Sequence, residues 1–450
     1  MSSIRSLRIK IGQTDIGSLF SLDDGRAYFR FDESYAMNPA RPTLSTSYLA
    51  STPAETQAQL LSPTLAMNVG AGGGRLPVFF RNLLPEGQLR KHLVAEGKLD
   101  TGDELALLAY CGEDLPGDVW ALSETLDEVA LGRLVTQSHD SYEMSSYQLP
   151  TPEAISLSGV QPKVSLVEAS GGRYVMRSKG DTGLHFIGKL PASDYAGLPE
   201  VEFTSLQLAA AAGVSVCHAD LLPLSAISSQ LPFTLREDAR NFLLVYRFDR
   251  DVDTATGRLH MEDFAQALEL PPDDKYKGSY VEIGLVLQLT SAAPEEDLFE
   301  LLRRVKVNEL LGNYDAHVKN FSLLYSVSGA ARLSPAYDIV AYAAYLHGRG
   351  HALKFYPEQK TQSLLTPAVL RELANLWEIP EARMKEVVSN TVDMAMRSWP
   401  AIIADSPMSA PQKAKLLEHI EANPSVQAWR RRNPSVTSAW LLQAQVQIDR

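Results

Sequence analysis

The stretch GNYDAHVKNFSLLY, residues 312–325, places a polar loop between two apolar segments. Before it, leucine and valine recur with the period of an amphipathic helix from Leu298 to Leu310, and Gly312 is a typical helix-ending residue. After it, FSLLY predicts a strand. The loop DAHVKN carries an acid, an imidazole, an amine and a carboxamide. A solvated connection needs none of these groups, so the loop is the first candidate for a site of chemistry.

The spacing of residues in and after this loop is similar to that of the protein-kinase-like phosphotransferases. Asp315 and Asn320 form a D-x-x-x-x-N pattern, and Asp338 follows beyond a predicted β-hairpin. Phosphoryl transfer needs a carboxylate beside the attacking hydroxyl, and Asp315 would orient that hydroxyl and accept its proton. Asn320 and Asp338 would supply the hard oxygen ligands that Mg²⁺ prefers. Lys319 would offset charge on the transferring phosphate. Because D-x-x-x-x-N alone is common, the other parts of a kinase should occur upstream.

Those parts occur upstream in the expected order. Residues 155–167, ISLSGVQPKVSLV, begin with small residues at the mouth of a predicted strand pair, where backbone amides would cover phosphates. Lys189 in HFIGKLP lies on a later predicted strand and would contact a phosphate. Glu202, at the start of the next helix, is the predicted partner of Lys189, the alternative being a solvated acid in the first turn. The strand LLVYRFDR, residues 243–250, would present its backbone to adenine.

A second phosphate-binding pattern in the same region is rejected. Residues 183–189, GLHFIGK, nearly match the P-loop pattern G-x-x-x-x-G-K-[ST]. Leu190, however, stands where Ser or Thr must meet magnesium, and no helix is predicted directly after it. We therefore do not expect a P-loop site.

The composition is ordinary for a soluble globular protein of more than one domain. The chain has 450 residues, 45% of them hydrophobic and 21% charged, and a net charge of -12. Such an acidic balance does not favour nucleic-acid binding by bulk charge, and the arginine triplet at residues 430–432 is interpreted as a solvated helix end. Cys111 and Cys217 have no partners at metal-ligand spacing, which excludes a cysteine-based zinc site. No apolar run resembles a signal-peptide core or a membrane span, so we expect a cytoplasmic protein.

The order of predicted elements indicates an α+β protein. Alternating apolar residues predict strands within residues 1–35, and strand patterns return in KVSLVEA, GRYVMRS and HFIGKL. Helical patterns dominate from about residue 260 onward. The polar segment TQSHDSYEMSSYQLP predicts a linker or surface loop. A sheet-rich part therefore precedes a helical part.

The ordered motifs resemble one family, HipA, the kinase toxins of bacterial HipBA toxin–antitoxin modules. They extend over almost the whole chain and read VFFRNLLPEG, ISLSGVQPK, IGKLP, VYRFDR, MEDFAQ, GNYDAHVKNFSL and LSPAYDI. The resemblance implies an α+β, protein-kinase-like, two-lobed fold. Its expected parts are a small N-terminal subdomain at residues 1–110, a kinase N-lobe with the phosphate loop and ATP lysine at 111–250, and an all-α C-terminal lobe with the catalytic loop at 251–450.

The resemblance also implies an activity and partners. The chain would use ATP and Mg²⁺ to phosphorylate serine or threonine on a translation-related protein, such as an aminoacyl-tRNA synthetase, and so inhibit growth. A HipB-like helix-turn-helix antitoxin would bind it, and operator DNA would be bound mainly through that antitoxin.

Individual roles follow from the resemblance by position. The catalytic residues would be Asp315, Lys189 and Lys319, with Asn320 and Asp338 as metal ligands. The ATP site would be lined by Ser158, Gly159, Val160, Gln161, Lys163, Lys189, Tyr246, Arg247, Phe248, His317, Asn320, Tyr337 and Asp338. Autophosphorylation of a loop serine would switch the kinase off, because a doubly charged group repels the triphosphate beside it. Since Ser158 stands where the family has a small alanine, the modified residue is either Ser156 or Ser158.

Two other functions remain open at this stage. The chain could be a catalytically weak co-repressor that acts mainly by binding a HipB-like DNA-binding antitoxin. It could also be a small-molecule kinase, since those enzymes share the D-x-x-x-x-N pattern and the later Asp. The first 110 residues and the loop SLSGVQPK favour the HipA-like interpretation.

Overall fold

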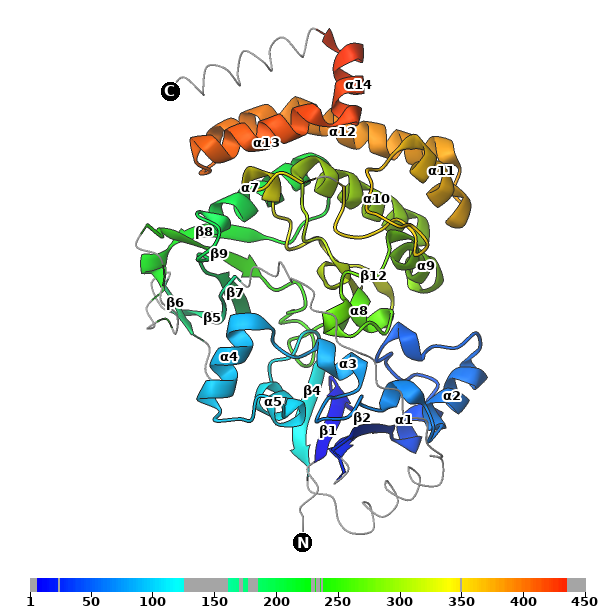
Figure 1. Cartoon of the computed structure of the whole chain (residues 1–450). Coiled ribbons are helices and arrows are strands. Elements are labelled where there is room, and N and C mark those ends of the chain that lie inside the picture. The colour runs from blue at the N-terminus through cyan, green and yellow to red at the C-terminus, as the bar shows by residue number, and fades with distance from the viewer. Residues whose placement is uncertain are drawn as a thin grey trace. The chain divides into compact units, whose positions relative to one another are not determined.

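The chain forms two compact units (Figure 1). The computed structural model describes residues 6–22, 25–124, 161–169, 173–176, 185–227, 231, 235, 238–348 and 350–434. The first unit contains the described residues up to 124, with two later segments, 251–262 and 269–273. The second contains the described residues of 161–250, 263–268 and 274–434. The domain boundaries expected after residues 110 and 250 stay predictions, and the predicted linker lies outside the described residues.

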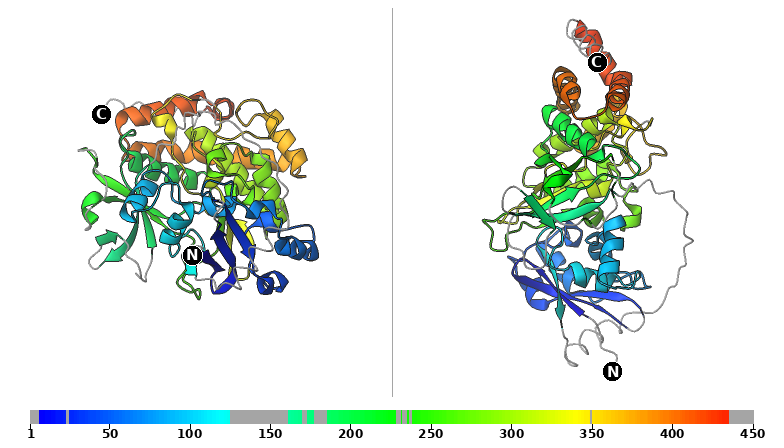
Figure 2. Two further views of the ribbon diagram at one scale, coloured as in Figure 1. Left: turned by 60° about the horizontal axis from the view of Figure 1, so that its bottom comes forward. Right: turned by 90° about the vertical axis from the view of Figure 1, so that its left-hand side faces the viewer.

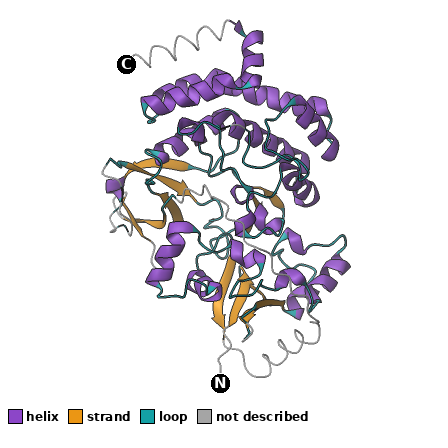
Figure 3. Ribbon diagram, in the orientation of Figure 1, coloured by secondary structure: helices purple, strands orange, loops and turns teal. Residues whose placement is uncertain are grey.

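The first unit is built on a four-stranded antiparallel sheet with the strand order β3-β2-β1-β4 (Figure 3). Leu7, Ile9 and Ile11 are at most 5% exposed, so the alternation seen in the sequence does direct one face of β1 into the core. The strands are β1 (Ser6–Ile11), β2 (Thr14–Ser21), β3 (Ala27–Phe31) and β4 (Val119–Glu124).

Short helices complete the core of the first unit. Phe29 of β3 packs edge-on against Phe80, with ring centroids 4.8 Å apart. The helical stretch predicted around VFFRNLLPEGQLRKHLVAEG is two helices, interrupted at Pro85, which has no backbone N–H to donate. The helices are α1 (Glu33–Met37), α2 (Pro53–Leu61), α3 (Val78–Asn82), α4 (Gly87–Glu96) and α5 (Glu104–Cys111), with 3-10 turns η1 (Thr46–Tyr48) and η2 (Ala66–Asn68).

The segment 251–262 belongs to the first unit through specific contacts. The buried Glu262 carboxylate accepts hydrogen bonds from Ser45 Oγ at 2.5 Å and from Thr46 N at 2.9 Å. The buried His260 lies with its Nε2 2.9 Å from the Leu44 carbonyl oxygen. The Arg258 guanidinium stacks 3.8 Å from the centre of the Trp120 ring. The chain after the predicted hinge strand is therefore part of the N-terminal core.

The second unit begins with a five-stranded antiparallel sheet of order β6-β5-β7-β9-β8. The predicted strands KVSLVEA, HFIGKL and LLVYRFDR form its centre, the last of them ending at Tyr246 and not at Arg250. Their register places Lys163 opposite Lys189, and Lys189 opposite Leu243. The strands are β5 (Lys163–Ala169), β6 (Arg173–Met176), β7 (His185–Lys189), β8 (Ala219–Pro223) and β9 (Asn241–Tyr246).

Helices make up most of the rest of the second unit. α7 packs between this sheet and α12, and α10 packs against α12 beside α7 (Figures 1 and 2). The α-helices are α7 (Leu198–Ala211), α8 (Phe264–Ala267), α9 (Tyr280–Thr290), α10 (Pro294–Leu311), α11 (Pro367–Leu376), α12 (Glu381–Asp405), α13 (Ala410–Ala422) and α14 (Pro424–Arg432). The 3-10 turns are η3 (Leu224–Ala226), η5 (Val318–Asn320) and η6 (Tyr342–Ala344); a further turn, η4 (Pro272–Asp274), begins in the segment of the first unit that ends at residue 273. The part of the chain after residue 250, expected to be all-α, also contains three strands: β10 (Met261–Asp263), β11 (Ser322–Tyr325) and β12 (Ala331–Leu333). The expectation of an all-α lobe is therefore wrong, because the apolar segments on both sides of the 326–330 turn pair as a hairpin.

The helix before the polar loop at residues 315–320, and the hairpin after it, form as predicted. α10 starts with Pro294 and three acidic residues in its first turn, both favourable at a helix N-terminus. It ends at Gly312, whose φ of 59° is left-handed. The polar loop follows, and β11 then pairs with β12 as the predicted hairpin. In the part of the chain that is described, no helix has the length and apolarity needed to cross a membrane.

Candidate active site

Lys189, at the end of β7, lies between two carboxylates of the second unit. Its Nζ contacts Glu202 Oε1 of α7 and Asp338 Oδ1, which confirms the predicted pairing of Lys189 with Glu202. The side chains of Lys189 and Glu202 are 6% and 1% exposed. Burial acts against the charge of Lys189, but the two carboxylates outweigh it and raise the pKa of the ammonium. The lysine is therefore held charged at a fixed place inside the protein.

Asp338 also contacts a second lysine of the five-stranded sheet. Lys163 Nζ of β5 lies 3.4 Å from Asp338 Oδ2. Burial alone would favour the neutral acid, but the charges of Lys163 and Lys189 hold the pKa of this carboxyl well below its usual range. Asp338 also has a φ of 52°, a left-handed conformation that is uncommon outside glycine. Such a backbone persists where its surroundings hold it, and it is frequent at functional sites.

Asp315 lies on the loop after α10 and is bonded by Tyr276, whose hydroxyl donates to Asp315 Oδ1. Burial raises the pKa of the Asp315 carboxyl above its ordinary value, while the hydrogen bond from Tyr276 and the charge of Lys275 oppose that rise. The Asp338 charge also contributes to raising this pKa, so the two carboxylates are close enough to interact. A carboxylate with a raised pKa is better suited to accepting a proton than an ordinary surface aspartate.

Two side-chain amides bond to the backbone of the loop that carries Asp315. Asn320 Nδ2 donates to the Asp315 carbonyl at 2.8 Å, which leaves its amide oxygen turned away from that carbonyl. Asn313 Oδ1 accepts from Asp315 N at 3.3 Å, and Asn313 Nδ2 lies 3.4 Å from the Asp338 carbonyl. His317 is buried and packs edge-on against Tyr276, with centroids 5.2 Å apart. Asn313 thus links the backbones of the two aspartates.

Lys319 and Tyr337 are placed by contacts that the sequence did not predict. Lys319 Nζ lies 3.1 Å from Asp263 Oδ2, and both side chains are largely buried. The Tyr337 hydroxyl donates to the Lys319 carbonyl at 2.8 Å and lies 2.5 Å from Ser322 Oγ. The predicted catalytic lysine is therefore neutralised by Asp263.

Of the three predicted hinge residues, one contacts the segment that carries Asp338. Phe248, just after β9, packs against Tyr337, with ring centroids 5.6 Å apart. Tyr337 directly precedes Asp338 in the chain. The Tyr246 hydroxyl instead donates to Asp220 Oδ2 of β8 at 3.0 Å. Arg247 makes two hydrogen bonds to the Asp249 carboxylate, at 3.0 and 2.8 Å.

Four predicted residues of the phosphate loop lie outside the described residues. These are Ser156, Ser158, Gly159 and Val160, so the structure does not place either candidate for autophosphorylation. Gln161 and Lys163 are described. Gln161 is buried, and its Nε2 has no hydrogen-bond partner within the described ranges.

Comparison with known proteins shows the family of the chain. Two family models match the chain: the HipA N-terminal domain over residues 7–122 and the HipA-like C-terminal domain over residues 155–399. The chain belongs to the HipA family. A Sinorhizobium fredii protein named "Putative kinase Y4dM" is 33% identical, over 96% of this chain and 99% of its own length.

More distant HipA proteins show the same relationship. The serine/threonine-protein kinase toxin HipA of Shewanella oneidensis is 25% identical over 63% of this chain and 67% of its own. A solved HipA chain from Shewanella oneidensis MR-1, in complex with HipB and operator DNA, matches with a TM-score of 0.63 at 20% identity. That match covers 94% of this chain and 99% of the solved chain, and it shows a shared fold. Membership of a kinase family implies ATP as the phosphoryl donor.

The residues of this HipA-family chain fit a magnesium nucleotide. Asp338 supplies an ionised carboxylate and Asn320 an amide oxygen, which are hard ligands of the kind Mg²⁺ takes. The buried Gln161 Nε2 and the ammonium groups of Lys163 and Lys189 are donors suited to phosphate oxygens. Both oxygens of Asp338 already contact lysines, so a bound metal would take the place of at least one ammonium.

Sequence reasoning missed three residues that shape this site. Tyr276 lies in a polar segment that carries no motif, so nothing in the sequence pointed to it. Asn313 stands beside the predicted helix end, and its amide was not assigned a role. Asp263 lies in MEDFAQ, a motif that supported the family resemblance without indicating a partner for Lys319.

Proposed function

We infer that this chain is an ATP- and Mg²⁺-dependent serine/threonine protein kinase and the toxin of a toxin–antitoxin module. The observation that carries this proposal is the position of Lys189 between Glu202 and Asp338, with Asp315 on the neighbouring loop. A buried lysine paired with a helix glutamate and a metal-binding aspartate is the arrangement protein kinases require for activity. The proposed fold is accordingly the two-lobed kinase fold.

Each residue then has a defined task. Asn320 and Asp338 would hold magnesium, whose charge would offset that of the triphosphate, and Lys189 and Lys163 would contact the phosphates of ATP. Asp315 orients the substrate hydroxyl. The hydroxyl oxygen forms a bond to the γ-phosphorus, the bond from that phosphorus to the bridging oxygen breaks, ADP leaves, and the hydroxyl proton passes to Asp315. Lys319, fixed by Asp263, contributes positive charge beside this loop.

The target and the regulation form the finer part of the proposal. The substrate would be a serine or threonine on a translation-related protein such as an aminoacyl-tRNA synthetase, and its modification would stop growth. Autophosphorylation of Ser156 or Ser158 would place negative charge beside the triphosphate and end activity. Since the solved Shewanella relative was determined with HipB and operator DNA, a HipB-like antitoxin is the proposed partner, and DNA would be bound mainly through it.

The experiment is phosphoryl transfer from γ-labelled ATP into a cell lysate. Wild-type protein should label at least one lysate protein when MgCl₂ is present. Asp315→Asn should not, because it removes the proton acceptor while keeping the side-chain shape. Asp405→Asn makes the same chemical change at an exposed position at the end of α12 and should behave as wild type. No labelling of any protein, including the kinase itself, would reject the proposal.

A second candidate function is favoured by the solved complex of the relative with HipB and DNA. In that case the chain would act mainly as a co-repressor with weak catalysis. Operator repression in the presence of the antitoxin should then be the same for wild type and Asp315→Asn, and wild type should not arrest growth when produced alone. Growth arrest by wild type but not by Asp315→Asn would favour the kinase toxin instead.

A further inference from the structure

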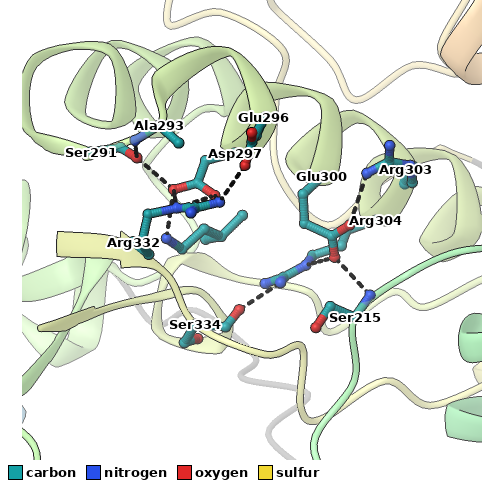
Figure 4. A network of polar contacts seen from close by, with 11 residues as sticks. Ser215, Ser291, Ala293, Glu296, Asp297, Glu300, Arg303, Arg304, Arg332 and Ser334 are labelled. Carbon is teal, nitrogen blue, oxygen red and sulfur yellow. Dashed lines mark hydrogen bonds and ion pairs between the residues drawn. The ribbon is translucent and has the colours of Figure 1, made fainter. Parts of the chain in front are cut away.

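A buried arginine on α10 contacts the segment that leads to Asp338 (Figure 4). The side chain of Arg304 is 2% exposed. Its Nε donates to Glu300 Oε1 at 3.0 Å, and its Nη2 donates to the Ser334 carbonyl at 2.5 Å. Its Nη1 has no hydrogen-bond partner within the described ranges. An incompletely paired buried charge is costly, so packing alone does not account for an arginine at this position.

Glu300 connects Arg304 to a second segment of the chain. Besides Arg304 Nε, its Oε1 accepts from the backbone N of Ser215 at 3.0 Å. Its other oxygen is contacted by Arg303 Nη1 at 3.1 Å, from a side chain that is 34% exposed. Figure 4 shows the Glu300 carboxylate between the two arginines and Ser215. The pair of Glu300 and Arg304 therefore bonds to the backbone of both Ser215 and Ser334.

Those two backbones meet directly before Asp338. Ala336 N donates to the Ser215 carbonyl at 2.7 Å, and Cys217 N donates to the Ala336 carbonyl at 2.9 Å. Both backbone groups of Ala336 are thus used in one short parallel bridge. Two residues later, Asp338 adopts its left-handed conformation, with its carboxylate against Lys189 and Lys163. Arg304 bonds to the Ser334 side of this bridge and Glu300 to the Ser215 side, and Ala336 in the bridge lies two residues before Asp338 in the chain.

Asp297, on the same face of α10, bonds to the preceding strand β12. Asp297 Oδ2 accepts from the backbone N of Leu333 at 2.9 Å, and Asp297 also pairs with Arg332. Side chains of α10 therefore bond to the backbone of two consecutive residues, Leu333 and Ser334. A shift of Arg304 would move the Ser334 carbonyl and, with it, the start of the Asp338 segment.

We propose that Arg304 and Glu300 form a positioning pair that sets the backbone of residues 334–338 and thereby aims the Asp338 carboxylate at bound magnesium. The inference rests on the proposed kinase function. Neither residue touches the reacting atoms, and both act through Ser215, Ser334 and Ala336. Residues that orient a metal ligand in this way commonly change metal affinity or activity by about tenfold or more when replaced.

The test compares Arg304→Met with Arg303→Met in the full chain. Both substitutions remove a guanidinium that contacts Glu300, but Arg303 reaches the carboxylate from a partly exposed position. The first readout needs neither metal nor nucleotide: hydrogen exchange of the Ala336 and Cys217 amides, both bonded in the bridge. Arg304→Met should speed their exchange relative to amides elsewhere in the unit, and Arg303→Met should not.

The second readout is the affinity for a non-hydrolysable ATP analogue, measured by calorimetry with EDTA and with MgCl₂. Arg304→Met should leave the metal-free affinity unchanged and reduce the gain due to Mg²⁺ by about tenfold. Arg304→Lys, which keeps the charge and one donor, should restore part of that gain. Arg303→Met should match wild type in both conditions.

Other outcomes overturn the inference. Equal amide exchange and equal affinities in Arg304→Met and Arg303→Met would overturn it. Faster amide exchange throughout the unit, with a loss of analogue affinity that does not depend on Mg²⁺, would also overturn it. If Arg304→Met does not fold, Glu300→Gln is the second variant, and an unchanged Mg²⁺ dependence in it would also count against the pair. A wild-type chain that binds the analogue equally with and without Mg²⁺ would overturn the proposed function together with this inference.

Discussion

At the scale of single residues, the site depends on charges that are buried but paired. Lys189 lies between two carboxylates, and Glu202 is 1% exposed. Removing one member of such a group leaves the others unpaired in a poorly hydrated interior, which costs more than the pair contributes. Stability and the proposed catalytic role are therefore coupled at Lys189, and variants must be chosen to separate them.

The first prediction concerns Lys189 and its partner. Lys189→Met should lower the free energy of unfolding by about 3 kcal/mol, because Glu202 is left as an unpaired buried carboxylate. The double variant Lys189→Met/Glu202→Gln should recover part of that loss but no phosphoryl transfer. Urea denaturation and transfer from labelled ATP measure the two effects. Recovery of activity in the double variant would show that Lys189 has no role in catalysis.

The second prediction concerns the pH dependence of Asp315. The hydrogen bond from Tyr276 favours the charged carboxylate and so opposes the rise in the pKa that burial causes. Tyr276→Phe removes that bond and should raise the pKa further. The acid limb of kcat/KM should then move to higher pH, since Asp315 must be ionised to accept a proton.

The control for this shift is Tyr110→Phe, at a tyrosine that is 42% exposed in the first unit. Its pH profile should overlay that of wild type. An acid limb in Tyr276→Phe that stays at the wild-type position would show that another group controls the ionisation.

At the scale of elements, the loop between α10 and β11 is shaped by the glycine that ends the helix. Gly312 has a φ of 59°, and a Cβ there would lie 2.7 Å from Ala343 Cβ and 2.9 Å from the Tyr314 hydroxyl. The sequence predicted this helix, its end and the following hairpin because all of these are encoded by local periodicity and by glycine. The strands β5, β7 and β9 were predicted for the same reason, although β9 ends at Tyr246 and the predicted strand ran on to Arg250.

The third prediction compares two glycines with positive φ. Gly312→Ala should destabilise the chain by more than about 1 kcal/mol and lower activity, because it adds both backbone strain and contacts at the catalytic loop. Gly329→Ala, in the turn between β11 and β12, has a φ of 82° with nothing within 4 Å of a Cβ, so it adds strain alone. Urea midpoints and transfer rates compare the two. Equal effects on both would show that the contacts around Gly312 do not shape the site.

At the scale of the whole molecule, the contacts that assemble the site join distant parts of the sequence. Lys163, Lys189, Glu202 and Asp338 come from two strands, a helix and a segment after a hairpin. Spacing predicted that Lys189 and Glu202 would pair, because the strand and helix are adjacent in the chain. The contact between Lys319 and Asp263, the bond from Tyr276 to Asp315 and the bridge at Ala336 depend on tertiary packing. No periodicity in the sequence encodes such contacts.

The fourth prediction concerns the first unit, where His260 is buried beside the Leu44 carbonyl. Burial lowers the pKa of His260 to about 4. The unfolded chain, with an ordinary histidine pKa of about 6.5, binds the proton first, so stability should fall as the pH drops below about 6.5. The loss attributable to this residue between about pH 7 and pH 5 is about 2 kcal/mol.

Urea midpoints across this pH range measure the effect. His260→Gln keeps a donor for the Leu44 carbonyl and should weaken the fall, whereas His347→Gln, at an exposed position, should leave it unchanged. If His260→Gln and wild type lose stability in parallel, the acid sensitivity arises elsewhere.

The measurement that tests the central claim most directly is the intact mass of the purified chain, before and after incubation with ATP and MgCl₂. Wild type and Asp405→Asn should gain phosphate, and peptide mapping should locate it on Ser156 or Ser158. Asp315→Asn should gain none. Phosphate gained equally by Asp315→Asn and wild type would contradict the assignment of this site as the kinase centre.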